Sequence, residues 1–159
     1  MESVSEDALR EARKKNDIGK YKKAVEMLHE HGIASIASLV FGFDSDDEKV
    51  FERTLEAIYD LDIDSIGANI LTPFPGTPLF DELKEQNRIF TYDWEKYDLY
   101  HVVHFPKRME PEMLLYGVKW LIKQFFSYSN IFKSFLKNAS LPMLYHLITS
   151  RLIYRREFK

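Results

Sequence analysis

The sequence contains no cysteine among its 159 residues. A chain without cysteine forms no disulfide framework, no thiolate metal site and no cysteine nucleophile, so composition alone excludes three classes of chemistry for it. What is present is typical of a globular domain. Hydrophobic residues make up 45% of the chain and aromatic residues 14%, which is enough for one domain with a real core.

Long apolar runs are also missing. No stretch approaches the roughly 18 apolar residues that a membrane-spanning helix needs. The opening residues, MESVSEDALREARKK, hold no apolar segment of the kind found in secretory signals. The absence of cysteine is compatible with a reducing compartment. We therefore expect a soluble, cytoplasmic protein.

Acidic residues are nearly absent from the last quarter of the chain. Glu157 is the only one after Val118, so residues 119–159 carry a formal charge of +7 and residues 1–118 carry −10. Basic and apolar residues alternate in this tail as in an interfacial helix: Lys133, Lys137, Arg151, Arg155 and Arg156 with Phe132, Phe135, Leu144, Leu147, Ile148 and Leu152. We expect the tail to pack on the acidic body. Peripheral contact with an anionic membrane is the alternative, and nucleic acid has no clear signal.

Hydrophobic periodicity predicts a strand–helix–strand unit after two helices, at about residues 6–14 and 20–31, the second ending before Gly32. Residues 33–43 are short, β-branched and apolar, which is typical of a strand buried on both faces. Ser45 and Glu48 then form a capping-box pattern ahead of a helix. Residues 65–72 are strand-like, so a right-handed strand–helix–strand unit is expected over residues 34–72 of an α/β fold.

The rest of the chain is predicted to be mainly helical. Thr77 and Pro78 suit the cap and the first position of a short helix, and Pro111 begins a longer one. Residues 130–138 and 141–156 have the pattern of two basic amphipathic helices. We therefore divide the chain into an α/β part, residues 1–90, and a helical extension with a basic tail, residues 91–159.

Two loops, residues 42–47 and 71–77, follow the predicted strands. Ligands bind beyond the carboxyl ends of strands in parallel α/β sheets, because backbone amides and helix N-termini gather there. Gly42 would let a ligand approach the backbone closely, and three prolines stiffen the region of the second loop. The alternative is that Gly42 and Gly76 only form tight turns.

Five strings follow one another along the chain: MESVSEDAL, KKND, KAVEMLHEHGI, SLVFGFDSDDEKVFERTL and NILTPFPGTPLFDEL. In order and spacing they resemble the second half of the radical S-adenosylmethionine (SAM) domain in cobalamin-binding radical SAM proteins. YDLYHVVHFPKRMEPEML resembles the extension that follows that core. The resemblance covers roughly residues 1–125 and implies the C-terminal part of a partial (β/α)6 barrel, from the end of its fourth strand, followed by a helical extension.

The resemblance also implies a chemistry. In the parent enzymes SAM chelates one iron of a 4Fe–4S cluster and is cleaved reductively to a 5′-deoxyadenosyl radical. Their C-x-x-x-C-x-x-C cluster loop is absent here, and cobalamin would need a further upstream domain. We expect a fragment, inactive alone, that supplies the SAM ribose and adenine side. Methyl transfer is one option for its reaction, and a separately encoded amino-terminal half is one option for its partner.

Four candidate SAM contacts lie near the start of the chain. Glu2 and Ser3 match a pair that touches the SAM ribose or amino group, and a carboxylate and a hydroxyl are suitable acceptors there. Their alternative is helix capping. Either Lys14 or Lys15 matches a basic position that pairs with the SAM carboxylate; the alternative for both is plain solvent exposure.

The other candidate contacts lie on the two predicted strands. Ser38 and Gly42 match the fifth-strand motif that contacts ribose and adenine, and Asp44 belongs to the GFD string usual in this group. In the sixth strand, whose backbone brackets the adenine ring, the matching residues are Asn69, Leu71 and Thr72. Leu71 has the alternative of being ordinary core.

No metal site is expected from the histidines or the acidic loop. His29 and His31 are two residues apart, and His101 and His104 three apart, whereas helical metal-binding pairs are usually four apart with a third ligand. Ordinary surface or capping histidines are favoured, with His101 and His104 as weak candidates for the substrate side. The acidic residues of 44–47 suit a helix N-terminus.

A second class of function stays open, namely a non-catalytic α/β module that binds a protein partner or a membrane surface through its basic tail. In either case we expect an exposed strand edge that lacks its neighbour, and we expect the chain to self-associate through it. The sequence does not name a substrate.

Overall fold

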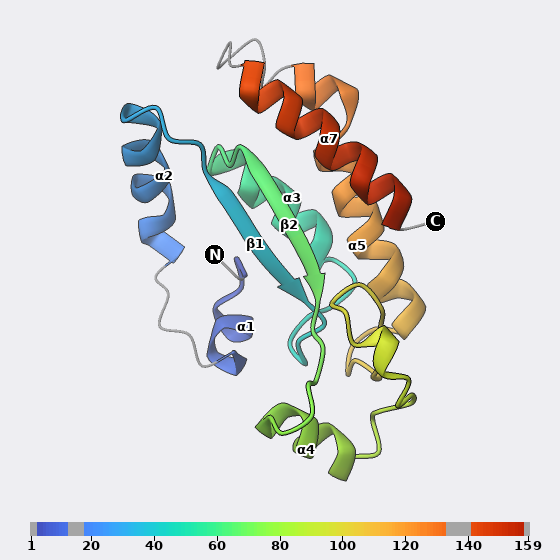
Figure 1. Cartoon of the computed structure of the whole chain (residues 1–159). Coiled ribbons are helices and arrows are strands. Elements are labelled where there is room, and N and C mark those ends of the chain that lie inside the picture. The colour runs from blue at the N-terminus through green and yellow to red at the C-terminus, as the bar shows by residue number, and fades with distance from the viewer. Residues whose placement is uncertain (1–2, 13–17, 133–140, 158–159) are drawn as a thin grey trace.

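A computed structural model describes residues 3–12, 18–132 and 141–157 (Figure 1). The elements, in chain order, are α1 (Glu6–Glu11), a short 3-10 helix η1 (Ile18–Lys20), α2 (Tyr21–Glu30), β1 (Ile36–Phe41), α3 (Val50–Asp60), β2 (Ser65–Ile70), α4 (Pro78–Glu85), a second 3-10 helix η2 (Trp94–Lys96), α5 (Pro111–Phe125) and α7 (Leu141–Glu157).

The strands β1 and β2 form a two-stranded parallel sheet, with α3 connecting them. Ile36 lies opposite Ser65 at one end, and Phe41 lies opposite Ile70 at the other. The mixed α/β class and the strand–helix–strand unit predicted over residues 34–72 are confirmed. Both strands are shorter than predicted. At their carboxyl ends the chain turns at Gly42 after β1 and enters the proline-rich loop after β2.

One face of the sheet carries the main hydrophobic core. Alternate residues of both strands point into it: Ala37, Leu39, Phe41, Ile66, Ala68 and Ile70. They pack against α3 and α5, and the rings of Phe41 and Phe51 lie 5.2 Å apart. Gly117 lets α5 approach α3 closely, since a Cβ there would lie 2.1 Å from the Phe51 ring. The core thus fixes α3 and α5 on the same side of the strands.

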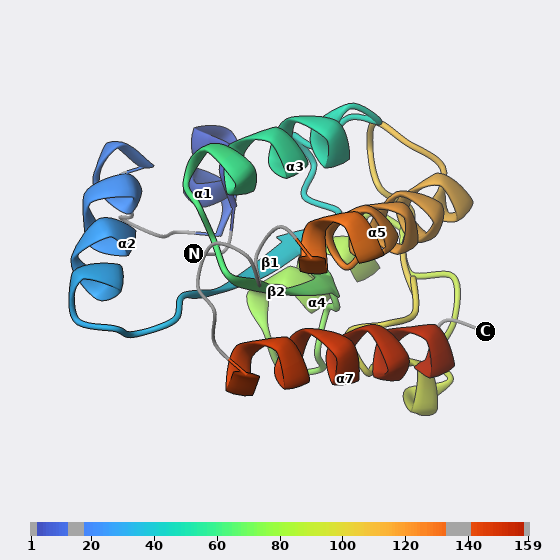
Figure 2. The same cartoon turned by 90° about the horizontal axis from the view of Figure 1, so that it is seen from above.

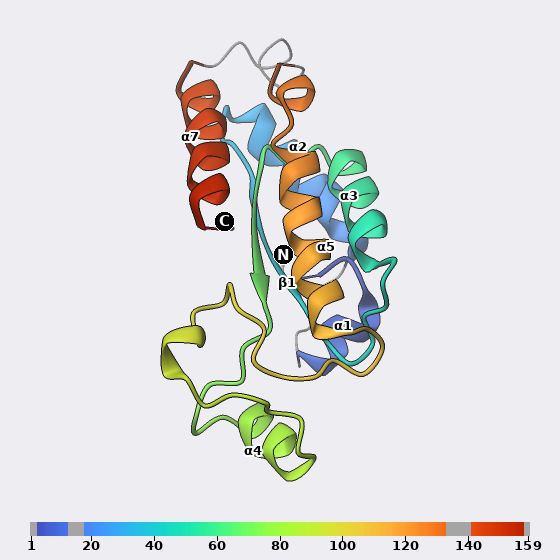
Figure 3. The same ribbon diagram turned by 90° about the vertical axis from the view of Figure 1, so that its right-hand side faces the viewer.

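The opposite face is only partly covered, by α7 (Figures 2 and 3). His146 on α7 lies 2.9 Å from the Ser65 hydroxyl, and the Tyr154 hydroxyl lies beside Gly67. On β1, however, Ile36 is 64% exposed and Ser38 is exposed as well. The prediction that this strand is buried on both faces was therefore wrong, because α7 contacts β2 and no neighbouring element covers the far side of β1 within the described ranges.

The described part of the tail packs on the body of the chain, as predicted, because α7 lies against β2 at Ser65 and Gly67. Within the tail itself, Leu147 is buried, Tyr154 stacks on Phe126, and Arg151 donates to the Phe126 carbonyl and lies over the Tyr128 ring. Apolar residues also occupy the outer side of the helix, where Tyr145, Ile148, Leu152 and Ile153 are exposed. The predicted helix at residues 130–138 lies mostly outside the described residues. Among the helices of the described ranges, none is long and apolar enough to cross a membrane.

Local capping signals were mostly predictive. His31 ends α2 with Gly32 at φ +70°, and the Thr77 hydroxyl accepts from the Phe80 amide at 3.3 Å with Pro78 in the first turn of α4. Before α1 the capping hydroxyl belongs to Ser5, which accepts from the Ala8 amide. Short-range sequence patterns therefore locate these helix ends.

The capping box expected at Ser45 and Glu48 is not formed. α3 begins five residues after Ser45, and the Ser45 hydroxyl has no hydrogen-bond partner within the described ranges. Instead, Asp47 accepts from the Lys49 amide at 3.1 Å through its carboxylate and from the Val50 amide at 2.9 Å through its carbonyl. Asp47 therefore holds the turn before α3, and the helix starts later than the capping pattern predicts.

Candidate functional site

A cleft of about 700 Å³ opens at the carboxyl ends of β1 and β2. In Figure 1 this end of the sheet faces α4, with α1 to one side. Its apolar walls consist of Val40, Phe43, Leu71, Pro78, Leu79 and Leu83. Ionisable groups from four different segments complete the lining: Glu11, Asp44, Glu82, His104 and Lys107. The combination of apolar walls and a few polar groups is typical of small-molecule sites.

Gly42 forms the point where β1 ends in the cleft. Its φ of +105° is a backbone conformation that glycine adopts readily and other residues rarely do. A Cβ at this position would also lie 2.9 Å from Leu114 Cδ2. Gly42 is thus needed both for the turn and for the close approach of α5, and its backbone forms part of the cleft wall.

Asp46 holds this turn from beneath. Its Oδ2 accepts hydrogen bonds from the amides of Gly42, at 2.9 Å, and Phe43, at 3.1 Å. The residue is only 2% exposed. Burial raises the pKa of Asp46 from 3.8 to about 6, although the two amide hydrogen bonds act in the opposite direction. Asp46 therefore takes up a proton in the weakly acidic range.

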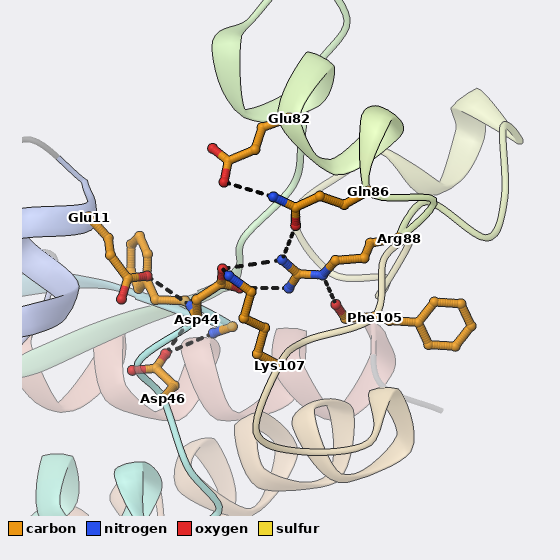
Figure 4. A network of polar contacts seen from close by, with 10 residues as sticks. Glu11, Asp44, Asp46, Glu82, Gln86, Arg88, Phe105 and Lys107 are labelled. Carbon is orange, nitrogen blue, oxygen red and sulfur yellow. Dashed lines mark hydrogen bonds and ion pairs between the residues drawn. The ribbon is translucent and has the colours of Figure 1, made fainter.

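Asp44 is the centre of an ion-pair network at the cleft rim (Figure 4). Arg88 contacts both of its oxygens, with Nη2–Oδ1 at 2.6 Å and Nη1–Oδ2 at 3.2 Å, and Lys107 Nζ lies 2.5 Å from Oδ2. The Asp44 amide donates to Glu11 Oε2 at 2.8 Å. Burial raises the pKa of Asp44, but the hydrogen bonds and charges of the two cations outweigh it and lower the pKa.

Arg88 is held in place by the chain segment that returns from α4. Its Nε donates to the Phe105 carbonyl at 2.8 Å, and its Nη1 donates to Gln86 Oε1 at 3.0 Å. The Phe105 amide donates back to the Arg88 carbonyl at 2.9 Å, and Ile89 forms an antiparallel bridge with His104. This short pairing brings residues 104–107 to the cleft.

His104 is buried in the cleft wall, with 1% of its surface exposed. Neither ring nitrogen has a partner with normal hydrogen-bond geometry within the described part of the chain, although the ring makes a looser hydrogen-bond contact with the Gly42 backbone. Burial lowers the pKa of His104 from 6.5 to about 4; the Gly42 backbone and the Asp44 charge oppose the shift, and the Arg88 charge adds to it. The imidazole is therefore neutral at neutral pH.

Three of the residues predicted to contact SAM line the cleft together, namely Gly42, Asp44 and Leu71. Ser38, Ser3, Asn69 and Thr72 lie outside its lining. Asn69 donates to the Leu39 carbonyl at 3.3 Å, Thr72 donates to the Ile70 carbonyl at 3.0 Å, and the Ser3 hydroxyl accepts from the Ser5 amide at 3.0 Å. The remaining candidates lie outside the described residues: Glu2, Lys14 and Lys15.

Sequence reasoning missed part of this site. Arg88 and Lys107 did not enter the candidate set, and His104 was only a weak candidate for the substrate side. Asp46 was interpreted as part of a charged helix N-terminus, whereas it is buried and its carboxylate accepts from the Gly42 amide. No local pattern marks these residues, because Arg88 meets Asp44 across 44 positions of the sequence.

The other histidines have ordinary structural contacts. His29 Nε2 lies 2.7 Å from Asp64 Oδ2, and His101 Nδ1 lies 2.9 Å from Asp98 Oδ2. Asp64 also accepts from the Ser35 amide and hydroxyl, which ties the end of α2 to the start of both strands. In the ranges that the structure describes, no three histidine or acidic residues gather as metal ligands would.

Comparison with known proteins gives relatives that are named as methyltransferases and as cyclases. No protein-family model matches the chain. The chain is 40% identical over 134 residues to the bacteriochlorophyllide d C-12(1)-methyltransferase of Chlorobaculum tepidum. The matched residues make up 84% of this chain and 29% of that protein. It is 27% identical over 152 residues to the bacteriochlorophyllide d C-8(2)-methyltransferase of the same organism, covering 94% of this chain and 33% of the relative.

A third relative is named for a different reaction. The chain is 29% identical over 119 residues to the anaerobic magnesium-protoporphyrin IX monomethyl ester cyclase of Cereibacter sphaeroides. The matched residues make up 75% of this chain and 19% of the cyclase. The chain thus spans a third or less of the length of these three relatives. It is similar, over most of its own length, to one part of enzymes named as methyltransferases of bacteriochlorophyllide and as a cyclase of a magnesium porphyrin ester.

Proposed function

We propose that this chain is the part of a radical SAM enzyme that binds the nucleoside portion of SAM. The observation that supports this most strongly is the cleft at the carboxyl ends of two parallel strands, formed by the LVFGFD and ILTPFPGTP segments that carry the family resemblance. Similarity at 40% identity to a methyltransferase over 84% of the chain supports the same function.

The residues of the cleft suit an adenosyl group. Phe43, Leu71 and Leu79 offer apolar surface on which a planar base can pack, and the Gly42 turn leaves room for it beside the backbone. Glu11 and Glu82 at the rim can accept hydrogen bonds from ribose hydroxyls or an ammonium group. In the proposed function these groups bind and orient SAM and exclude water from its base.

The 4Fe–4S cluster of the proposed enzyme does not fit this chain. Cysteine thiolates hold such clusters, and the chain has none. The cluster ligands, and any cobalamin-binding domain, would therefore belong to another part of the enzyme. In this proposal β1 and β2 are consecutive strands of a partial (β/α)6 barrel, and α5 belongs to the extension after it.

The proposed barrel requires a further strand beside β1. Within the described ranges β1 pairs only with β2, so its outer edge is open. An unpaired edge is a template for another strand. The proposal is that this edge receives the preceding strand of the same enzyme, encoded in the same or a separate chain, and that the isolated chain self-associates through it.

The reaction proposed for the whole enzyme is methyl transfer to a magnesium tetrapyrrole. The support is that two of the three relatives are named as bacteriochlorophyllide methyltransferases and the third as a magnesium-protoporphyrin cyclase. SAM would supply the radical chemistry or the methyl group when bound. The described residues themselves contribute binding and positioning.

Isothermal titration with S-adenosylhomocysteine, a stable analogue of SAM, tests the nucleoside site. We expect the purified chain to bind the analogue and Leu71→Gln to weaken it, because the substitution places an amide in the apolar wall. Leu152→Gln is the matched control, since Leu152 is 59% exposed on α7 and remote from the cleft lining. No binding by the unmodified chain, or equal loss in both variants, would contradict the proposed function.

A second candidate is a binding module that uses α7 to contact a membrane or a protein. The observation in its favour is the exposed apolar side of α7, with Tyr145, Leu152 and Ile153 each more than half exposed. Sedimentation with anionic vesicles tests it. Binding that is lost in Ile153→Glu would support the module, and no sedimentation of the unmodified chain would leave the nucleoside site as the better explanation.

A further inference from the structure

His104 is a buried polar side chain in the cleft wall whose hydrogen-bonding capacity is poorly used. It is 1% exposed, it lines the cleft, and neither of its ring nitrogens has a partner with normal hydrogen-bond geometry within the described ranges. Its contact with the Gly42 backbone is a looser one. Buried polar side-chain atoms nearly always have a well-placed partner in folded proteins. An imidazole without one in the wall of a binding cleft therefore points to a partner that is supplied by a ligand.

The neighbouring polar groups are already engaged. The Asp44 oxygens contact Arg88 and Lys107, and Asp46 Oδ2 accepts from the backbone amides of Gly42 and Phe43. Both carboxylates are thus engaged in charge-assisted contacts. A hydrogen bond from His104 to either of them would compete with the contacts that shape the turn and the rim.

The backbone around His104 holds its position. The bridge between Ile89 and His104 and the hydrogen bond from the Phe105 amide to the Arg88 carbonyl fix the strand-like segment. The preceding residue, Val103, is fully buried in a second small core with Phe80 and Tyr97. Since adjacent side chains of an extended segment point to opposite sides, His104 stays on the side of the cleft.

We propose that His104 binds the ligand of this cleft by a hydrogen bond to an uncharged polar group of a nucleoside, such as a ring nitrogen, an amino group or a hydroxyl. This inference rests on the proposed nucleoside site. A neutral imidazole offers one donor and one acceptor, and it carries no charge that would require a counter-ion. In a cleft with apolar walls, such an imidazole favours ligands whose rings carry uncharged polar groups over ligands with purely apolar rings. His104 is thus a specificity-determining residue for the nucleoside, whereas the sequence analysis gave it only as a weak candidate for the substrate side.

Two variants separate this role from a structural one. In His104→Leu the ring is replaced by an apolar side chain, so we expect the affinity for S-adenosylhomocysteine to fall about tenfold and the melting temperature to stay the same or rise. His101→Leu is the matched control, because His101 lies three residues away, is exposed and is paired with Asp98. Its affinity should stay within about twofold of the unmodified chain.

A second measurement does not depend on the folding of a variant. The ¹⁵N resonances of the His104 ring in the unmodified chain should shift on saturation with S-adenosylhomocysteine, while those of His101 stay in place. An affinity in His104→Leu equal to that of the unmodified chain, or ring resonances that do not move while the analogue binds, would overturn the inference and leave the nucleoside site intact. A chain that binds no analogue would overturn both.

Discussion

Asp46 and His104 make opposite contributions to the pH dependence of stability. Burial raises the pKa of Asp46 to about 6, so the folded state binds this proton more tightly than the unfolded state, and its contribution to stability increases as the pH falls toward 4. Burial lowers the pKa of His104 to about 4, so here the unfolded state binds the proton more tightly. The contribution of His104 to stability therefore decreases as the pH falls from about 6.5 to about 4.

The two contributions are of similar size. One pKa unit corresponds to about 1.4 kcal/mol, so each group changes the free energy of unfolding by about 3 kcal/mol when fully titrated. Between pH 7.5 and pH 5, Asp46 should add about 1 kcal/mol and His104 should remove about 2 kcal/mol. The unmodified chain should therefore lose only about 1 kcal/mol through this pair over that range.

Removing either group should reveal the other. Asp46→Asn keeps an acceptor oxygen for the Gly42 and Phe43 amides but no longer titrates, so its stability should fall by about 2 kcal/mol from pH 7.5 to pH 5. His104→Leu retains Asp46 and should gain about 1 kcal/mol over the same range. The other ionisable groups titrate alike in all three proteins, so differences between the curves isolate this pair.

Urea unfolding at pH 7.5, 6.3 and 5, followed by tryptophan fluorescence, measures these free energies. The slope of stability against pH should have opposite signs in the two variants, with the unmodified chain between them. If stability changed with pH in the same way in all three proteins, the opposite pKa shifts assigned to the buried Asp46 and His104 would be refuted.

Three further predictions concern packing, the ion-pair network and capping. Gly117→Ala should lower the free energy of unfolding by about 1–3 kcal/mol in urea, because the added Cβ would lie 2.1 Å from the Phe51 ring. Arg88→Met should cost about 2 kcal/mol and raise the Asp44 pKa toward its ordinary value, as followed by a carboxyl NMR titration, because two charge-assisted hydrogen bonds are lost. Thr77→Ala should cost about 1 kcal/mol in thermal unfolding, because it removes the cap of α4.

Each of these predictions has a control or a contradicting result. Gly67→Ala is the control for the packing variant, since its Cβ would meet only the Tyr154 hydroxyl, at 3.8 Å. Equal effects of the two glycine variants would argue against the close approach of α5 to α3. An unchanged titration of Asp44 in Arg88→Met would contradict the network, and an unchanged melting temperature in Thr77→Ala would show that the cap contributes nothing measurable.

The parts of the fold that depend on local patterns were predictable from the sequence. The alternation of apolar runs with helical periodicity located β1, α3 and β2, and Gly32, Thr77 and Pro111 marked helix ends where the structure has them. These features depend on backbone conformation and on hydrogen bonds within a few residues. A strand end followed by Gly42 was accordingly enough to locate one wall of the cleft.

The features that were missed depend on contacts between distant segments. Ser45 matches a capping pattern, but α3 begins only at Val50, and Asp47 accepts from the Lys49 amide in the turn before it. The pairing of Asp44 with Arg88 and Lys107 requires the return of the chain from α4, which no local pattern specifies. The exposure of one face of β1 depends on which elements neighbour the strand, and a sequence run alone does not determine that.

The most direct test of the nucleoside site is a titration of the ¹⁵N-labelled chain with S-adenosylhomocysteine, followed through backbone amide resonances. The proposed function predicts saturable shifts at Gly42, Phe43, Asp44 and Leu71, which surround the cleft, with no comparable shifts on α2 or α7. Shifts confined to α7, or no saturable shifts at all, would contradict it.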